Sequence, residues 1–158
     1  MTFVSTVYYE SITLIERLHR QFLDVLKVEL ERAGILDINN VQSMILYNIG
    51  TDELTVGELT MRGFYLGSNV SYNVKKMVEN GYLLQERSIH DKRSVRVKLS
   101  EKGRRLNEGM SRLYKRHEER LVDAGLTDER FEMMNKVLHD LEAFWAEQMG
   151  AGGLSLIS

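Results

Sequence analysis

The sequence predicts a mainly helical α+β fold, in which long helices at both ends flank three short helices and a β-hairpin. Apolar residues recur at helical spacing over most of the 158 residues, and proline is absent. The period changes to strict alternation only around 94–99. These features favour long uninterrupted helices and leave room for a single hairpin.

The first predicted helix covers 5–33, with Gly34 as a C-terminal cap. Its apolar residues return every three or four positions, so that one face is apolar along the whole helix. A second helix is predicted over 39–49 and stops at Gly50. The predicted packing residues of this second helix are Val41, Met44, Ile45 and Tyr47.

The third and fourth helices are short and follow closely on one another. Thr55 and Glu58 have the spacing of a capping box, which predicts a helix from there to about Gly63. Ser68 is the predicted cap of a fourth helix that ends near Asn80. The apolar face of this fourth helix is formed by Val70, Val74, Met77 and Val78.

A β-hairpin follows the fourth helix. Residues 82–87 and 94–99 are the predicted strands, and in the second strand apolar residues alternate with basic ones. The polar stretch 88–93 between them forms a charged tip.

Two long helices complete the chain. They are predicted over 100–124 and 127–149, capped by Ser100 and Thr127, and 150–158 is a glycine-rich tail. The terminal helices carry more apolar surface than the small core formed by 39–99 can cover, so a second copy of the chain is expected to bury the surplus. We therefore expect a single domain over 1–158, with 5–33 and 100–149 as dimerisation helices.

Composition excludes several classes of function. The chain has no cysteine, so disulfides, cysteine-ligated metals and thiol chemistry are excluded. No apolar run is long enough to span a bilayer, and no signal peptide is recognisable, which predicts a cytoplasmic protein without a membrane partner. Phosphate-binding loops and catalytic motifs are absent, and the four histidines are scattered. We expect no enzyme, no metal site and no cofactor.

The net charge of −2 conceals a marked segregation. The segment 62–105 holds eleven basic and four acidic residues, which gives +7, and the remainder carries −9. Such a basic segment is often only a solvated face. Here it coincides with a helix-turn-helix followed by a hairpin, an arrangement that places one helix in the major groove of DNA. The combination predicts a winged helix-turn-helix over 39–99 that binds double-stranded DNA.

Three stretches resemble the MarR family of bacterial transcriptional regulators. Residues 91–103, DKRSVRVKLSEKG, match the wing signature D-x-R-x-x-x-V-x-L-[TS]-x-x-G. Residues 54–59 are similar to the opening of the family's third helix, and 77–87 match L-x-x-x-G-[LY]-[IL]-x-x-x-R apart from Met77. The resemblance implies a dimeric winged-helix fold over essentially the whole chain.

The resemblance also implies which residues contact DNA. Arg93 matches the wing arginine that enters the minor groove, and Asp91 the acid that orients it. The predicted wing residues are Arg87, Asp91, Lys92, Arg93, Ser94 and Arg96. The predicted residues of the recognition helix are Ser68, Asn69, Ser71, Tyr72, Asn73, Lys75 and Lys76.

Two positions of that helix depart from the family pattern. Tyr72 stands where a basic residue is common, and Asn73 where an apolar one is common. For Asn73, a base contact and a local hydrogen bond near the start of the helix are equally good interpretations.

The resemblance further implies a small aromatic or phenolic effector that binds between the dimerisation helices and the DNA-binding lobe. The candidate pocket residues are His19, Arg20, Phe22, Met44 and Tyr47, for which ordinary core packing is the alternative. The function predicted on these grounds is a homodimeric repressor on a pseudo-palindromic operator, released by its effector. The alternative is a winged-helix module that docks an acidic protein partner.

Overall fold

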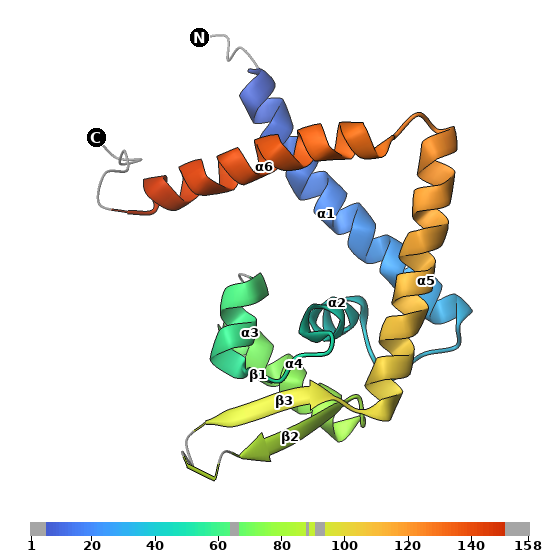
Figure 1. Cartoon of the computed structure of the whole chain (residues 1–158), viewed down its shortest axis with the longest axis vertical. Coiled ribbons are helices and arrows are strands. Elements are labelled where there is room, and N and C mark those ends of the chain that lie inside the picture. Colours follow the sequence, from blue (N-terminus) through green and yellow to red (C-terminus); the bar gives the residue numbers. More distant parts are fainter. Residues whose placement is uncertain (1–5, 64–66, 88, 91–93, 151–158) are drawn as a thin grey trace. The chain divides into compact units, whose positions relative to one another are not determined.

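The computed structural model describes residues 6–63, 67–87, 89–90 and 94–150 and confirms the predicted mainly helical fold with a small sheet (Figure 1). The predicted order of elements is confirmed, and one additional short strand, Leu54–Thr55, precedes the third helix. The elements are α1 (Val7–Arg32), α2 (Asn40–Ile49), β1 (Leu54–Thr55), α3 (Val56–Gly63), α4 (Gly67–Glu79), β2 (Leu83–Arg87), β3 (Val95–Leu99), α5 (Glu101–Asp123) and α6 (Asp128–Gln148).

The chain divides into two compact units. The first, Met1–Met110, contains α1 to α4, the sheet and the beginning of α5. The second, Ser111–Ser158, contains the rest of α5 and α6.

Side-chain caps fix the starts of the helices. Asn39 and Gln42 form a reciprocal capping box at α2, and Thr127 accepts a hydrogen bond from the backbone N–H of Arg130 at α6. Ser100 caps α5 by accepting from the N–H of Gly103 at 3.1 Å. The prediction that Ser68 caps the fourth helix is wrong by two residues, because α4 already begins at Gly67 and Ser68 lies in its first turn. A difference of this size is normal for helix ends, where the first turn lacks complete backbone hydrogen bonding.

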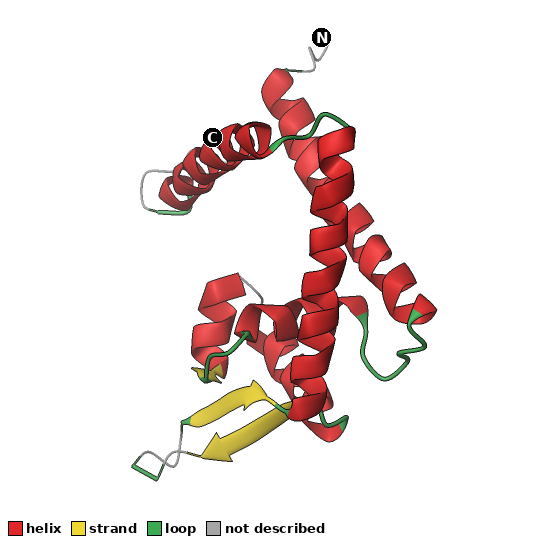
Figure 2. Ribbon diagram, turned by 45° about the vertical axis from the view of Figure 1, so that its right-hand side comes forward, coloured by secondary structure: helices red, strands yellow, loops and turns green. Residues whose placement is uncertain are grey.

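The described residues form a sheet of three antiparallel strands in the order β1-β3-β2, and its two longer strands stand out in yellow in Figure 2. In β2 and β3, Leu83 pairs with Leu99 and Arg87 with Val95. The additional strand β1 pairs Leu54 with Val97. Two residues are too few to show an alternating pattern, so β1 could not be predicted from the residues around the start of the third helix.

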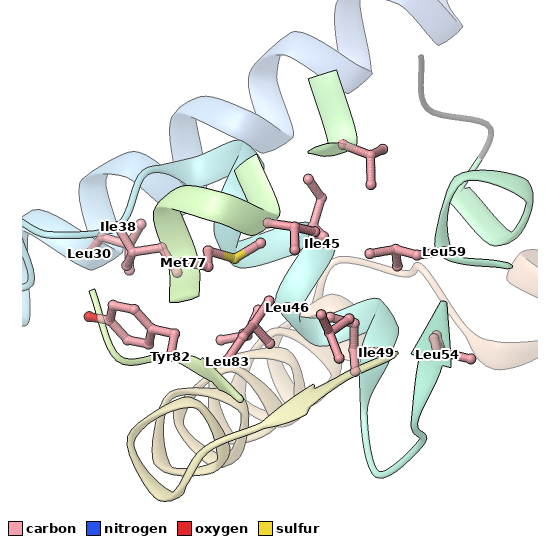
Figure 3. Close-up of a cluster of buried hydrophobic side chains, with 13 residues drawn as sticks. Leu30, Ile38, Ile45, Leu46, Ile49, Leu54, Leu59, Met77, Tyr82 and Leu83 are labelled. Atoms are coloured by element: carbon pink, nitrogen blue, oxygen red, sulfur yellow. The ribbon is translucent and has the colours of Figure 1, made fainter. Parts of the chain in front are cut away.

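The core of the first unit lies between α2, α4 and the sheet (Figure 3). The predicted packing face of α2 is partly wrong: Ile45 is buried, but Val41 is exposed, whereas Leu46 and Ile49 are completely buried. The true inner face of α2 also contains the polar residues Gln42 and Ser43, which are buried as well. Because these two polar residues interrupt the apolar pattern of α2, the face predicted from the spacing of apolar residues differs from the face that is buried.

The second unit has a different character, because α6 has no buried residue in the single chain. The exposed large apolar side chains of α6 are Met133, Met134, Val137, Leu138 and Phe144. The N-terminal helix α1, in the first unit, also exposes several large apolar residues and buries only Leu26 and Leu30.

Candidate nucleic-acid interface

The helix α4 has one face in the core and the opposite face in solvent. Val70, Val74 and Met77 are at most 5% exposed and anchor the helix against the core. Their spacing of four and three residues places them on one stripe of the helix. The predicted DNA-contacting residues Asn69, Ser71, Tyr72 and Lys75 are exposed, whereas Asn73 and Lys76 are half-buried. Ser68 belongs to the helix, but its side chain is outside the described part of the chain.

The basic residues of α4 differ in their surroundings. The Lys76 ammonium lies 3.5 Å from the Glu79 carboxylate and 6.0 Å from the centre of the Tyr72 ring. Lys75 is exposed, and its ammonium makes no hydrogen bond or ion pair with any described residue. Lys75 therefore offers a charge that no described acid neutralises, and its position suits a phosphate contact.

Asn73 is connected to α2 rather than to its own helix. Its side-chain oxygen accepts a hydrogen bond from the amide nitrogen of Gln42 at 3.1 Å. Gln42 was not among the residues selected from the sequence. The only available signal was the Asn39-x-x-Gln42 spacing of a capping box, which predicts a helix start and gives no information on the partner across the fold.

The hairpin β2–β3 forms the wing, and its two strands are described up to Arg87 and from Ser94 onward. Arg87 and Arg96 are exposed, and Ser94 is half-buried. The predicted wing residues Asp91, Lys92 and Arg93 lie outside the described residues.

Lys98 on β3 holds two acidic side chains at the base of the wing. Its ammonium lies 3.4 Å from the Glu86 carboxylate and 3.5 Å from that of Glu53. The charge of Glu86, followed by its hydrogen bond and the charge of Glu53, raises the pKa of Lys98. These acids reduce the positive potential at Lys98.

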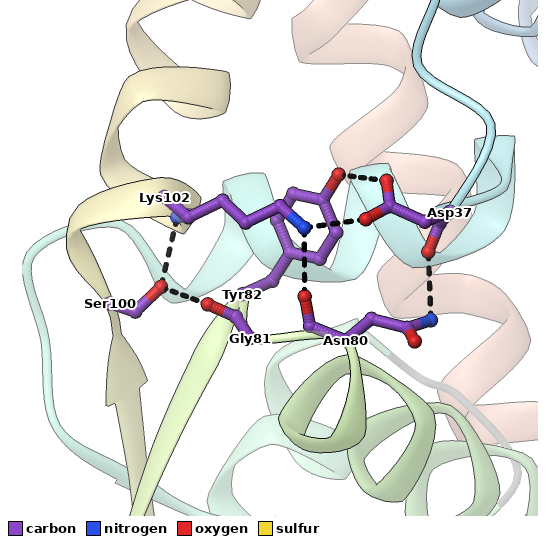
Figure 4. A network of polar contacts seen from close by, with 7 residues as sticks. Asp37, Asn80, Gly81, Tyr82, Ser100 and Lys102 are labelled. Atoms are coloured by element: carbon purple, nitrogen blue, oxygen red, sulfur yellow. Dashed lines mark hydrogen bonds and ion pairs between the residues drawn. The ribbon is translucent and has the colours of Figure 1, made fainter.

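The base of the wing is fixed to α5 and to the loop before α2 by a polar network (Figure 4). The Asp37 carboxylate accepts hydrogen bonds from the Tyr82 hydroxyl and the Lys102 ammonium, both at 2.5 Å. Lys102 also donates to the backbone oxygen of Asn80, and its ammonium lies 4.3 Å from the centre of the Tyr82 ring. The hydrogen bond from Lys102, followed by that from Tyr82, lowers the pKa of Asp37. Burial, with the neighbouring Asp37 carboxylate, raises the pKa of Tyr82.

Backbone contacts strengthen this junction. The N–H of Ser100 donates to the backbone oxygen of Tyr82 at 3.0 Å, and the Ser100 hydroxyl donates to that of Gly81 at 2.5 Å. Gly103 sits so close to the Tyr82 carbonyl that any Cβ atom would overlap its oxygen. The glycine at the end of the wing signature is therefore required by the approach of α5 to Tyr82.

The helix α3 is held by contacts at both ends. The backbone N–H of Thr55 donates to the Glu58 carboxylate, and the N–H of Glu58 donates to the Thr55 hydroxyl, which confirms the predicted capping box. At the other end, Arg62 pairs with Asp52 at 2.8 Å and donates to the backbone oxygen of Asn48. Arg62 is therefore engaged in positioning α3.

The five candidate pocket residues lie on α1 and α2 in the first unit. His19 and Arg20 are exposed, and Arg20 pairs with Glu16 at 2.5 Å. Phe22, Met44 and Tyr47 are half-buried. Their role as an effector pocket stays a prediction.

The second unit contains a hollow of about 370 Å³ with a different lining. It lies where α5 turns into α6, and its walls include Tyr114, His117, Leu121 and Phe131. His117 is half-buried there.

Among the described residues, no three histidine, aspartate or glutamate side chains converge on a point where a metal ion could bind. None of the described helices is both long enough and apolar enough to cross a membrane.

Comparison with known proteins places this geometry among transcriptional regulators. The model of the MarR family matches residues 36–94, which contain the helix-turn-helix and most of the wing. The transcriptional activator ExpG of exopolysaccharide II synthesis, from Rhizobium meliloti strain 1021, is 41% identical over 138 residues. That alignment covers 87% of this chain and 71% of ExpG.

Two solved structures share the fold. FabT of Streptococcus pneumoniae, crystallised in complex with DNA, has a TM-score of 0.72 and 23% identity, with 89% of this chain and 98% of that chain covered. MarR of Staphylococcus aureus in complex with salicylate and kanamycin has a TM-score of 0.71 and 19% identity, with 89% and 93% covered.

Proposed function

Because this chain belongs to the MarR family of DNA-binding transcriptional regulators, we propose that it binds a pseudo-palindromic operator as a homodimer in the cytoplasm. In this proposal α4 reads the major groove and the wing arginine Arg93 enters the minor groove. Two copies place their recognition helices about one helical turn of DNA apart, so the operator is expected to have two half-sites.

One observation carries the proposal: α4 presents polar side chains to solvent from a rigid base. The side chains of the apolar stripe of α4 are at most 5% exposed. The opposite side of the helix exposes Asn69, Ser71, Tyr72 and Lys75 to solvent. Short polar side chains can reach base edges, and lysine suits phosphates as a point charge. The helix lies within the 62–105 segment of charge +7, which supplies the attraction to DNA.

The unburied apolar surface of the terminal helices supports the homodimer. Val137 on α6 is 64% exposed and Phe144 is 50% exposed in the single chain. On α1, Val7 is 81% and Leu18 is 55% exposed. Apolar surface on this scale is uncommon on a monomer, and a second copy would bury it.

We further propose that a small aromatic or phenolic effector modulates DNA affinity. The likeness to a Staphylococcus aureus protein solved with salicylate supports this chemistry. The candidate pocket remains the set His19, Arg20, Phe22, Met44 and Tyr47. An effector changes DNA affinity only if it binds the DNA-competent and incompetent states with different affinities.

The sign of regulation separates two candidate functions. The sequence prediction is a repressor, whereas the similarity to ExpG favours an activator. Transcription in vitro from a captured promoter decides between them, because an activator raises transcript yield and a repressor lowers it.

The test of the proposed function is capture of genomic DNA fragments by the purified protein, followed by sequencing and a titration at several salt concentrations. Enrichment of discrete sites with two half-sites, bound with a steep salt dependence, supports it. Absent or salt-insensitive binding to DNA contradicts it and favours the module that docks an acidic protein.

A further inference from the structure

The side-chain amide of Asn73 has its orientation fixed by a chain of hydrogen bonds that starts at the backbone. The N–H of Asn39 donates to the side-chain oxygen of Gln42 at 3.1 Å. The amide nitrogen of Gln42 in turn donates to the side-chain oxygen of Asn73 at 3.1 Å. A backbone N–H can only donate, so the direction of each following hydrogen bond is determined.

The middle member of this chain is buried and cannot turn without cost. Gln42 is 7% exposed, and its backbone N–H donates to the Asn39 side chain at 2.8 Å. A buried amide is normally satisfied by hydrogen bonds, and both ends of the Gln42 side chain have a partner here. The Asn73 oxygen is therefore held toward the interior of the first unit.

The opposite end of the Asn73 amide is left as a donor. Asn73 is half-buried, and within the described residues its amide nitrogen has no acceptor. On the helix, Asn73 lies between the buried stripe of Val70 and Val74 and the exposed side that carries Asn69. An N–H₂ group at this border is available to an acceptor outside the protein.

We infer that Gln42 is a specificity-determining residue that acts through Asn73: it makes Asn73 present a hydrogen-bond donor to an acceptor on the operator. This inference rests on the proposed role of α4 as the recognition helix. The acceptor is either a base edge or a phosphate oxygen. Among base edges, guanine presents two acceptors, N7 and O6, in the major groove. Adenine pairs one acceptor with one donor, and a two-bond contact to it needs the Asn73 oxygen that Gln42 already engages.

The substitution Gln42→Glu tests the inference by reversing the amide. A glutamate side chain still accepts from the N–H of Asn39, but its second oxygen cannot donate. Asn73 must then turn to donate inward, and its oxygen faces the operator. Asn73→Asp also presents an outward acceptor without altering the buried position, with an added negative charge. Gln42→Met is the matched control, because it has a similar length and leaves Asn73 free to adopt both orientations.

The readout is selection from a randomised DNA library by each full-length variant, with folding verified by circular dichroism and thermal unfolding. If Asn73 contacts a base, Gln42→Glu and Asn73→Asp change the preferred base at one position per half-site from an acceptor-bearing to a donor-bearing base. Gln42→Met then weakens the base preference at that position. If Asn73 contacts a phosphate, Gln42→Glu and Asn73→Asp weaken binding to all sites by about tenfold or more without changing the selected sequence. Either result supports the inference.

Unchanged affinity and unchanged base preference in folded Gln42→Glu and Asn73→Asp would overturn it. This result is distinct from failure of the proposed function, in which the wild-type protein itself would select no sequence.

Discussion

Asp37, in the connection before α2, is joined to Lys102, in the first turn of α5, by an ion pair of 2.5 Å between residues 65 positions apart in the sequence. The same carboxylate accepts the Tyr82 hydroxyl, so three segments of the first unit meet at one side chain. This junction fixes the base of the wing, and its strength is measurable.

Asp37→Asn is expected to lower the free energy of unfolding by about 1 kcal/mol at pH 7. The effect is modest because the two paired side chains are 45% and 43% exposed, so solvent screens the pair. The pKa of the Asp37 carboxyl is lower in the folded state than in the unfolded chain. The stabilisation of the fold by the Asp37 carboxylate is therefore fully present above the ordinary carboxyl pKa of about 4, and it is lost as the pH falls through the lowered pKa. Urea unfolding at fixed protein concentration should show the two proteins converging at acidic pH.

The control for this prediction is Glu16→Gln, which breaks the exposed pair with Arg20 on α1. That pair joins two side chains about 65% exposed within one helix, so a loss of about 0.5 kcal/mol or less is expected. An equal loss in both variants would show that the Asp37 junction has no special role.

Gly103→Ala is expected to destabilise the protein by about 2 kcal/mol or more, because the added methyl group overlaps the backbone oxygen of Tyr82. Backbone atoms cannot move aside as a flexible side chain can. Gly57→Ala in α3 is the matched control: its Cβ would lie 3.8 Å from the Thr55 hydroxyl, an ordinary contact, so a neutral or slightly stabilising effect is expected. Thermal unfolding of both variants gives the comparison, and equal melting temperatures would contradict it.

Lys75→Ala is expected to weaken binding to all DNA sequences alike and to reduce the slope of log affinity against log salt by about 1. The reason is the loss of one phosphate contact from a lysine that no described acid neutralises. Lys27→Ala, an exposed lysine on α1 outside the basic segment, should leave the slope unchanged. Fluorescence anisotropy at four or five salt concentrations measures the slopes of both variants. Identical slopes for Lys75→Ala and Lys27→Ala would show that Lys75 does not contact DNA.

Arg93→Ala is expected to weaken operator binding by about tenfold or more while leaving the protein folded and dimeric. Arg93→Lys retains the charge but loses the planar guanidinium, so it should recover only part of the affinity. A gel-shift titration on one captured site measures the series. Wild-type affinity for the alanine variant would exclude the wing role of Arg93.

Val137→Glu is expected to shift the homodimer toward monomer, because it places a charge within the apolar surface of α6. Sedimentation velocity over a range of protein concentrations measures the shift. Met61→Glu on α3 is the control, since Met61 is 75% exposed but lies away from the terminal helices in the sequence. If Met61→Glu dissociated the protein and Val137→Glu did not, the assignment of α6 to the interface would be wrong.

The fold was largely predictable from local signals. The caps at Thr55, Ser100 and Thr127 and the glycines after the helices set the boundaries of most elements to within a residue or two. Alternation of apolar and basic residues likewise indicated β3. Such signals act between residues close in sequence, where geometry depends little on the rest of the chain.

The contacts that arrange the candidate site were not predictable in the same way. The pairs Gln42–Asn73 and Asp37–Lys102 join residues 31 and 65 positions apart. Each partner taken alone is a polar or charged residue of a type that is common on protein surfaces. The strand β1 is defined by its neighbour β3 and has no periodicity of its own. These features arise from the packing of distant segments and become visible only with the tertiary structure.

The pairing of β1 with β3 has a consequence for the DNA. Because β3 is bonded to β1 on one side and to β2 on the other, the root of the wing is tied both to the start of α3 and to the segment after α4. In the proposed complex with DNA, this pairing is expected to hold the separation between the two groove contacts of a half-site nearly constant. A sequence whose grooves do not match that separation would have to deform, so the stiffness of the intervening base pairs would become part of operator choice.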